Sequence, residues 1–179
     1  MSRAVAWSVT LGSQNAEPLP VTATLDAPSP TSAGCMNVTP ECRDRVRAAL
    51  FNSGEVWPNA VVGLSIPSAP QPAGVADLAV GVSVLAASGA LRSAPLGKIM
   101  FAAALGLDGS LRAVEGTWAA FDAAPLLGIT HAVVPQLLLS EFGTSAGITV
   151  VGATTLSAVL AWLRGTRALP CAGTHRWGP

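Results

Sequence analysis

The sequence predicts an α+β domain in which a mixed β-sheet carries helices mainly on one face. Two β-rich segments, residues 4–11 and 19–26, open the chain. Strand-like and helix-like segments then follow in an irregular order rather than as strict βα repeats. Hydrophobic residues make up 50% of the 179 residues and charged residues 11%, which is enough apolar material for one sizeable core.

Residues 21–26 alternate apolar and polar side chains, as in a strand with one solvent-exposed face. The first helix, which follows this strand, has clear start and stop signals. After a loop, Thr39 can accept hydrogen bonds from the first free amides of a helix, and Pro40 suits the first helical position. The sequence Asn-Ser-Gly at 52–54 ends this helix.

The same helix carries the candidate charged surface. Arg43, Arg45 and Arg47 form a possible interaction surface, although interleaved acids favour a solvated, ion-paired face over a phosphate-binding one. Glu41 and Arg45 are spaced for an i,i+4 ion pair. Cys42 falls on the apolar face, which favours a buried, inert thiol over a reactive thiolate.

The later elements follow from the same rules. Asp77 is expected to cap the second helix, and Asp108 and Gly109 suit the tight turn of a hairpin. The predicted elements are a strand at 60–66, a helix at 77–88, hairpin strands at 101–107 and 111–114, a helix at 117–124, a strand at 130–135, a helix at 136–142, a strand at 148–151 and a helix from 154 or 155 to 164. We expect one domain over residues 1–165 and a loose C-terminal tail over 166–179.

The net charge and the cysteines indicate which partners and which cellular compartment are expected. Ten basic and ten acidic residues cancel, so any contact with DNA is expected to be indirect or weak. Cys35, Cys42 and Cys171 show no metal-binding spacing, and their odd number without an export signal favours the cytoplasm. Residues 142–163 carry no charge, but glycine and threonine interrupt them, so we expect a strand and a helix rather than a membrane span.

Isolated polar residues suggest no catalytic or metal centre. A role for Asp77 as a helix cap outweighs a role in a site, and Asp108 is expected to be a turn residue. His131 lies in a strand pattern and His175 in the tail, so no serine–histidine–acid or metal constellation can be assembled. We therefore expect no cofactor.

Three blocks carry a family resemblance. Residues 41–54 read ECRDRVRAALFNSG against a family pattern of ESRERVRAAL-NSG, residues 74–89 read GVADLAVGVSVLAASG against roughly GSAFDLPIALGILAASG, and residues 107–116 read LDGSLRAVEG against LDGSLRPVRG. In this order and spacing they resemble the N-terminal domain of the ComM/YifB family, also described as magnesium-chelatase-subunit-like. That domain is similar to the Lon protease domain, so the resemblance implies a ribosomal protein S5 domain 2-like (Lon protease-like) fold.

The resemblance also indicates where a peptidase site would lie. Lon-type peptidases carry a serine at the entrance of the second helix and a lysine after the hairpin, and the amine must be close enough to take the serine proton. The corresponding, degenerate positions of this chain are Gly74, Val75, Ala76, Asp77 and Trp118, while Lys98 is the only lysine. We therefore expect no peptidase activity.

An ATP site is not expected within these residues either. Members of the family continue into an AAA+ ATPase module, whereas this sequence stops at Pro179. The segment most similar to a phosphate-binding loop is residues 89–99. Its spacing is too long, and Ile99 stands where serine or threonine would bind magnesium. It also follows a helix and enters a strand, which reverses the usual context.

These observations favour a pseudoenzyme: a non-catalytic interaction or oligomerisation module. Its expected partners are a second copy or a full-length AAA+ relative. The resemblance implies a link to DNA processing, because ComM proteins act as ring-shaped helicases in natural transformation. Two alternatives remain open: an enzyme or small-ligand-binding protein with an unrecognised site near Asp77 and Trp118, and a truncated remnant without a selected function.

Overall fold

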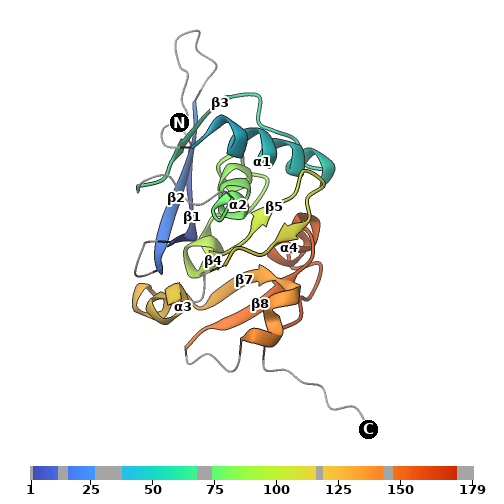
Figure 1. The fold of residues 1–179 in the computed structure, drawn as a ribbon. Helices are drawn as coiled ribbons and strands as arrows, with labels where there is room; N and C mark the ends of the chain where they lie inside the picture. The colour runs from blue at the N-terminus through green and yellow to red at the C-terminus, as the bar shows by residue number, and fades with distance from the viewer. Residues whose placement is uncertain are drawn as a thin grey trace.

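A mixed β-sheet forms the centre of the molecule (Figure 1). The computed structural model describes residues 2–11, 16–26, 38–67, 74–115, 119–142 and 147–172. Within them the sheet order is β3-β2-β1-β4-β7-β8, and β5 and β6 form a separate hairpin. The strands are β1 (Ser2–Leu11), β2 (Ala16–Asp26), β3 (Val61–Ser65), β4 (Ile99–Phe101), β5 (Ala104–Leu105), β6 (Leu111–Arg112), β7 (His131–Pro135) and β8 (Thr149–Ala153). β2 runs antiparallel to β1 and β3, while β1, β4, β7 and β8 run parallel, so the expected mixed sheet is confirmed.

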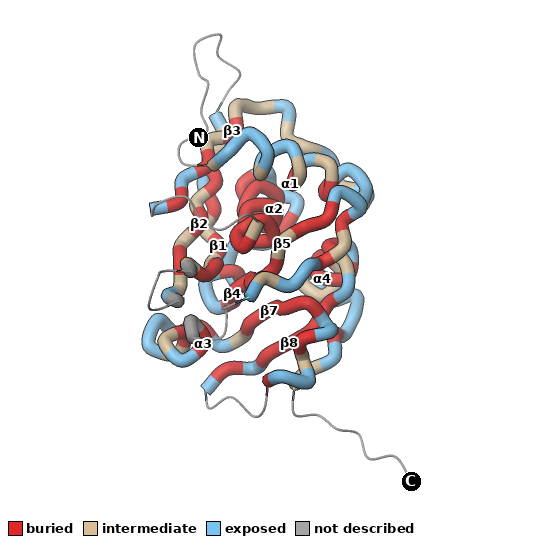
Figure 2. Tube along the Cα trace, in the orientation of Figure 1, coloured by how far each residue is buried: buried red, intermediate tan, exposed pale blue. Residues whose placement is uncertain are grey.

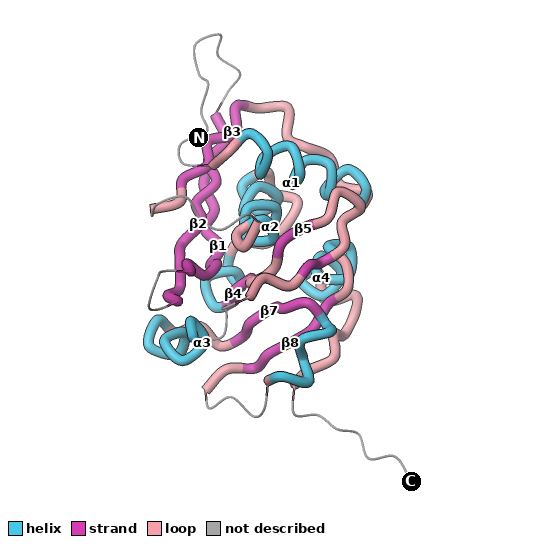
Figure 3. Tube along the Cα trace, viewed as in Figure 1, coloured by secondary structure: helices cyan, strands magenta, loops and turns pink. Residues whose placement is uncertain are grey.

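The helices lie close to the predicted segments (Figure 3). The described α-helices are α1 (Pro40–Asn52), α2 (Asp77–Ala87), α3 (Ala119–Ala123) and α4 (Leu156–Leu163), and the 3-10 helices are η1 (Ala94–Lys98), η2 (Ala124–Leu127) and η3 (Gln136–Glu141). The helix expected at 136–142 is thus a 3-10 helix. None of the helices in the described part of the chain is both long and apolar enough to cross a membrane.

The core lies between the sheet and a fully buried helix. Each residue of α2 is buried (Figure 2), because α2 packs against β1 and β2 on one side and against α1 on the other. The facing side chains of the two strands pair in register, with Ala6 opposite Val21 and Ala4 opposite Ala23, all of them buried. The apolar residues that alternate along 21–26 therefore lie on the face of β2 against which α2 packs.

The hairpin leaves the main sheet earlier than the sequence suggested. The strand expected over 101–107 is divided: β4 ends at Phe101, and β5 begins at Ala104 in the small sheet. The reason is that the carbonyl of Ala103 accepts a 3.3 Å hydrogen bond from the amide of Leu78 in α2. The break carries β5 away from β7 and towards α1 and α2.

The predicted turn at Asp108-Gly109 is confirmed. The amide of Gly106 donates to the carbonyl of Ser110 at 2.8 Å, and Gly109 has a φ of 82°. The Asp108 carboxylate accepts from the side chain of Ser110 at 2.7 Å and from its amide at 3.0 Å. These bonds, the side-chain bond first, lower the pKa of Asp108 below its usual value.

The hairpin also joins the end of α1 to the start of α4. The Nδ2 of Asn52 donates to the carbonyl of Leu107 at 2.8 Å. On the other side, the amide of Leu156 donates to the carbonyl of Gly109 at 2.8 Å. Thr155 caps α4 by accepting a 3.2 Å bond from the amide of Ala158. The hairpin tip is thus fixed between two helix ends.

Part of the expected loose tail is ordered. Cys171 pairs with Val151 in an antiparallel bridge, the amide of Gly152 donates to the carbonyl of Pro170 at 2.9 Å, and Leu169 is buried. Backbone groups on the free edge of a strand need partners, and these residues supply them. Residues 173–179 lie outside the described part of the chain.

Gly106→Ala should destabilise the domain. An added methyl group would overlap Ser110 Oγ and Asp108 Oδ1, which are hydrogen-bonded to each other. Both atoms end short side chains that can move away, so we expect a loss of about 1 kcal/mol in the free energy of unfolding, from their broken hydrogen bond, measured by urea denaturation. Gly97→Ala is the matched control, because nothing lies within 4 Å of the added methyl group, and it should change stability by less than about 0.5 kcal/mol. Equal effects of the two substitutions would contradict this account of the hairpin.

Candidate functional site

The entrance of α2 is the position at which the sequence pointed to a degenerate site. A turn precedes the helix, with the amide of Asp77 donating to the carbonyl of Gly74 at 2.9 Å. Val75 and Ala76 are both buried and apolar. Beneath them, buried Ser8 of β1 donates its hydroxyl to the carbonyl of Val75 at 3.2 Å. The entrance is thus packed with apolar side chains, and the hydroxyl below it is already hydrogen-bonded.

Asp77 is not the helix cap that the sequence suggested. The residue at the cap position is Ala76, which has no side-chain hydrogen bond, and Asp77 is the first residue of α2. Its carboxylate, with an exposed fraction of 0%, is directed at α1 and β5 instead of at the amides of its own helix. The prediction failed because the strongest partners of this carboxylate lie far away in sequence.

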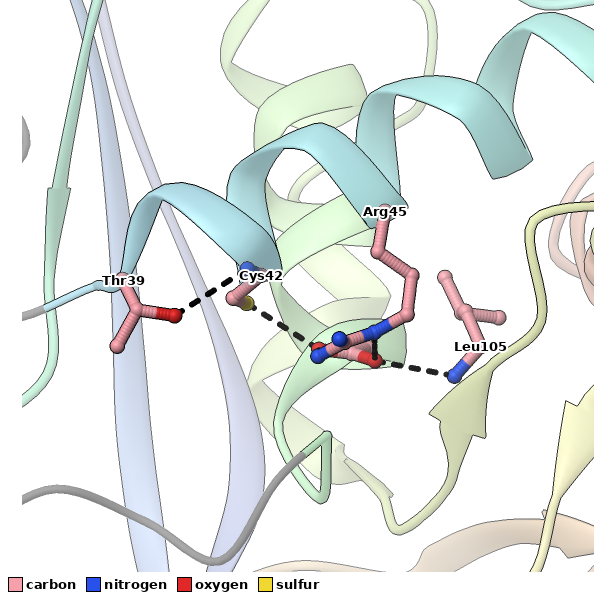
Figure 4. A network of polar contacts seen from close by, with 5 residues as sticks. Thr39, Cys42, Arg45 and Leu105 are labelled. Atoms are coloured by element: carbon pink, nitrogen blue, oxygen red, sulfur yellow. Dashed lines mark hydrogen bonds and ion pairs between the residues drawn. The ribbon is translucent and has the colours of Figure 1, made fainter.

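Three donors converge on that carboxylate (Figure 4). Arg45 binds the carboxylate in a bidentate manner, with its Nε 2.6 Å from Oδ2 and its Nη2 3.0 Å from Oδ1. The amide of Leu105 donates to Oδ2 at 3.2 Å, and Cys42 Sγ donates to Oδ1 at 3.2 Å. Each carboxylate oxygen therefore accepts two hydrogen bonds, so both oxygens are engaged by donors of the same chain.

The electrostatics of this network are those of a buried ion pair. Arg45 is 27% exposed while Asp77 is fully buried, and the hydrogen bonds that Arg45 donates to Asp77 raise the pKa of Arg45. A buried carboxylate needs both a counter-charge and hydrogen bonds to be tolerated, and the network supplies both. Asp77 also lies in the first turn of α2, where a negative charge is favoured by the helix dipole.

Arg45 corrects two expectations about α1. It forms its ion pair with Asp77, 32 positions away, and not with Glu41. It therefore faces the interior and does not share a solvated surface with Arg43 and Arg47, which are exposed. Arg43 forms a short-range ion pair with the neighbouring Asp44 at 3.1 Å, and an exposed pair of that kind adds little stability.

Cys42 occupies a half-buried position at the start of α1. Its amide donates to Thr39 Oγ1 at 3.3 Å, as the predicted helix cap requires, and its thiol is directed at Asp77. The thiol is half-buried rather than buried: Cys42 packs against the apolar core, as its place on that face of the helix predicted, and its thiol also belongs to the polar network.

His131, which the sequence placed in a strand, does not join the network. Trp118 lies outside the described residues. His131 lies within β7, where its Nδ1 is 2.9 Å from Thr130 Oγ1 and its ring packs against Trp162. Within the described residues, no three histidine, cysteine or acidic side chains are grouped so that they could hold a metal ion.

Sequence reasoning missed the pairing of Arg45 with Asp77. No periodic rule links two residues on different helices, so helix spacing paired Arg45 with Glu41 instead. The one available signal is that Arg45 and Asp77 both fall inside the blocks that carry the family resemblance, at positions where the family pattern has the same residue types.

Arg45→Met should destabilise the domain strongly, because it leaves the buried Asp77 carboxylate without its counter-charge. We expect a loss of about 3 kcal/mol in the free energy of unfolding, at the lower end for a buried pair since Arg45 is partly exposed. Arg43→Met on the same helix removes only an exposed pair and should change stability by less than about 1 kcal/mol. Urea denaturation of the two variants measures the difference. Similar losses in the free energy of unfolding would show that the Arg45 network does not stabilise the packing of α1 on α2.

Cys42→Ser and Cys42→Ala separate the hydrogen bond of the thiol from its volume. Serine keeps a donor directed at Asp77 Oδ1, whereas alanine removes it. We expect Cys42→Ala to cost about 1 kcal/mol and Cys42→Ser to cost less, as followed by thermal and urea denaturation. A serine variant less stable than the alanine variant would show that Cys42 contributes by apolar packing instead.

The residues that form the network lie within the part of the chain that is similar to known proteins. A family model described as subunit ChlI of Mg-chelatase matches residues 33–137, which include α1, α2 and the hairpin. Each alignment below covers 26% of the relative, so the chain spans about a quarter of the length of these curated proteins.

Three relatives illustrate the similarity. The Mycobacterium tuberculosis protein Rv2897c is 38% identical over 131 residues, and YifB of Escherichia coli is 34% identical over 131 residues, each alignment covering 72% of this chain. The competence protein ComM of Haemophilus influenzae is 32% identical over 134 residues, or 74% of this chain. Because the family model matches more than half of its residues, the chain belongs to the Mg-chelatase ChlI-like family.

Proposed function

We propose that this chain is a non-catalytic interaction or oligomerisation module, a degenerate Lon/ComM-like domain that has kept its scaffold and lost its chemistry. The observation that carries this proposal is the entrance of α2. Val75 and Ala76 are buried and apolar there, and both oxygens of Asp77 are occupied by Arg45, Cys42 and Leu105. A site built in this way can hold elements together, but it offers no nucleophile or base to a substrate.

The position of the lysine supports the same proposal. Lys98 directly precedes β4, whereas the entrance of α2 contacts Ala103, beyond the opposite end of β4. Five residues of extended chain span about 16 Å, which is much too far for an amine to take a proton from a hydroxyl at the entrance.

The proposal extends to fold family, compartment and partners. The mixed sheet with its β5–β6 hairpin supports a ribosomal protein S5 domain 2-like (Lon protease-like) fold. The partners we propose are a second copy or a full-length AAA+ relative in the cytoplasm. One relative is named a competence protein, which supports an indirect link to DNA processing.

An apolar surface suitable for such a partner lies where α1 ends. Three large side chains project into solvent there: Phe51 is 78% exposed, Val56 80% and Leu107 61%. The hydrogen bond from Asn52 to the carbonyl of Leu107 holds the hairpin tip against the end of α1. We call Phe51, Val56 and Leu107 the apolar corner. Exposed apolar side chains on well-ordered elements are common features of protein interfaces.

Substitutions in the apolar corner should weaken association without unfolding the domain. Phe51→Ser and Leu107→Asn remove exposed apolar surface only, so their melting temperatures should stay close to that of the wild type. Size-exclusion chromatography with light scattering, and pull-down of AAA+ proteins from the native host, measure association. We expect the wild type to self-associate or to capture an AAA+ relative, and the double variant to lose at least about tenfold in affinity.

Leu126→Asn is the control for this experiment. Leu126 is 86% exposed on η2, outside the apolar corner, so its substitution removes a similar apolar area and should leave association unchanged. A wild type that stays strictly monomeric and captures no AAA+ protein would contradict the proposed function. Equal losses in the Leu126 variant and the double variant would contradict the apolar corner alone.

A further inference from the structure

The outer edge of β8 is covered by the residues that follow α4. β8 is the terminal strand of the described sheet, and its sequence, TVVGA, contains no charge or proline to discourage a further strand from pairing. Residues 169–172, which we call the strap, run antiparallel along it (Figure 1). The amide of Gly152 donates to the carbonyl of Pro170 at 2.9 Å, and the amide of Ala172 donates to the carbonyl of Val150 at 2.8 Å.

The strap is held by these backbone bonds and by the packing of Leu169, Cys171 and Ala172 against the core. Leu169 is its buried side chain, whereas Ala168 and Pro170 beside it are exposed. By contrast, β8 itself is buried through Val150, Val151 and Ala153. A segment of four residues with one fully buried and two half-buried side chains opens at a lower free energy than the fully buried strand beneath it, so the strap can detach while the sheet remains intact.

The bonds made by the strap define what can replace it. The outward-pointing groups of β8 flank Val151: the amide of Gly152 on one side and the carbonyl of Val150 on the other. A second β8, related by a two-fold axis through Val151, would present the same two groups in antiparallel orientation. The amide of Gly152 in each copy would then donate to the carbonyl of Val150 in the other copy, which reproduces both strap bonds.

We propose that the edge of β8 is a self-pairing surface whose occupant is the β8 of a second copy of this chain, and that the strap keeps it closed. The strap shows that an antiparallel strand fits at this edge. A second copy is favoured because a two-fold axis satisfies the same donor and acceptor twice. This inference does not rest on the apolar corner or on the proposed function, since it concerns a different edge of the molecule.

Leu169→Asp in the full chain tests the proposal by removing the anchor of the strap. We expect the molar mass from light scattering to double relative to the wild type as concentration rises. In dilute solution the amide of Gly152 should exchange its hydrogen about tenfold faster than in the wild type, because its acceptor at Pro170 is lost. In the associated form this amide should be protected again. Ala168→Asp places the same charge on the exposed neighbour and should behave as the wild type does.

Ala172→Pro is a second variant that keeps Leu169 and removes only the donor to the carbonyl of Val150. It should change mass and exchange in the same direction as Leu169→Asp. The proposal is overturned if both variants keep the wild-type mass and the wild-type protection of Gly152, or if they associate while Gly152 stays unprotected. Loss of the fold in both variants also overturns it, because the domain must survive without the strap. A wild type that associates through the apolar corner leaves these comparisons intact, since they are differences from the wild type at Gly152.

Discussion

The buried ion pair between Arg45 and Asp77 is the constraint on which the arrangement of this domain depends. Asp77 begins α2, the one helix of the described residues that is buried along its whole length, so its charge has no access to water. The charge is tolerated only because α1 supplies Arg45 and β5 supplies the amide of Leu105. Three segments that are distant in sequence must therefore meet at one carboxylate, and the positions of α1 and of the hairpin follow from that requirement.

The same constraint supports the loss of peptidase chemistry that we propose for this scaffold. A catalytic carboxylate must keep a lone pair for a substrate proton, whereas Asp77 directs both oxygens to donors of its own chain. Arg45 and Asp77 lie within the stretch matched by the ChlI model, so the network belongs to the part of the chain that defines the family. A network that fixes the helices is independent of the serine and lysine of a peptidase, and it can remain when they are absent.

Local patterns were sufficient for most of the elements, but not for the break between β4 and β5 or for the contacts between elements. Alternation along β2, the Thr39-Pro40 helix start and the Asp108-Gly109 turn depend on neighbouring residues, and each was read correctly from the sequence. The capping role assigned to Asp77 and the pairing of Glu41 with Arg45 were wrong, because the partners that decided them lie on other elements. The strap was missed for a related reason: a loop-like composition cannot reveal that an exposed sheet edge requires cover.

The helix α4 connects the two surfaces of this domain. At its start, the amide of Leu156 is bonded to the hairpin whose tip carries Leu107. At its end, Arg164 forms a bidentate ion pair with Glu55, beside Val56 of the apolar corner, and the hydrogen bonds that it donates to Glu55 raise the pKa of Arg164. The chain then turns at Thr166, whose amide and hydroxyl both bond to the carbonyl of Ala161, before it enters the strap. Because one short helix carries both attachments, the apolar corner and the edge of β8 are held in a fixed relation even when the strap is displaced.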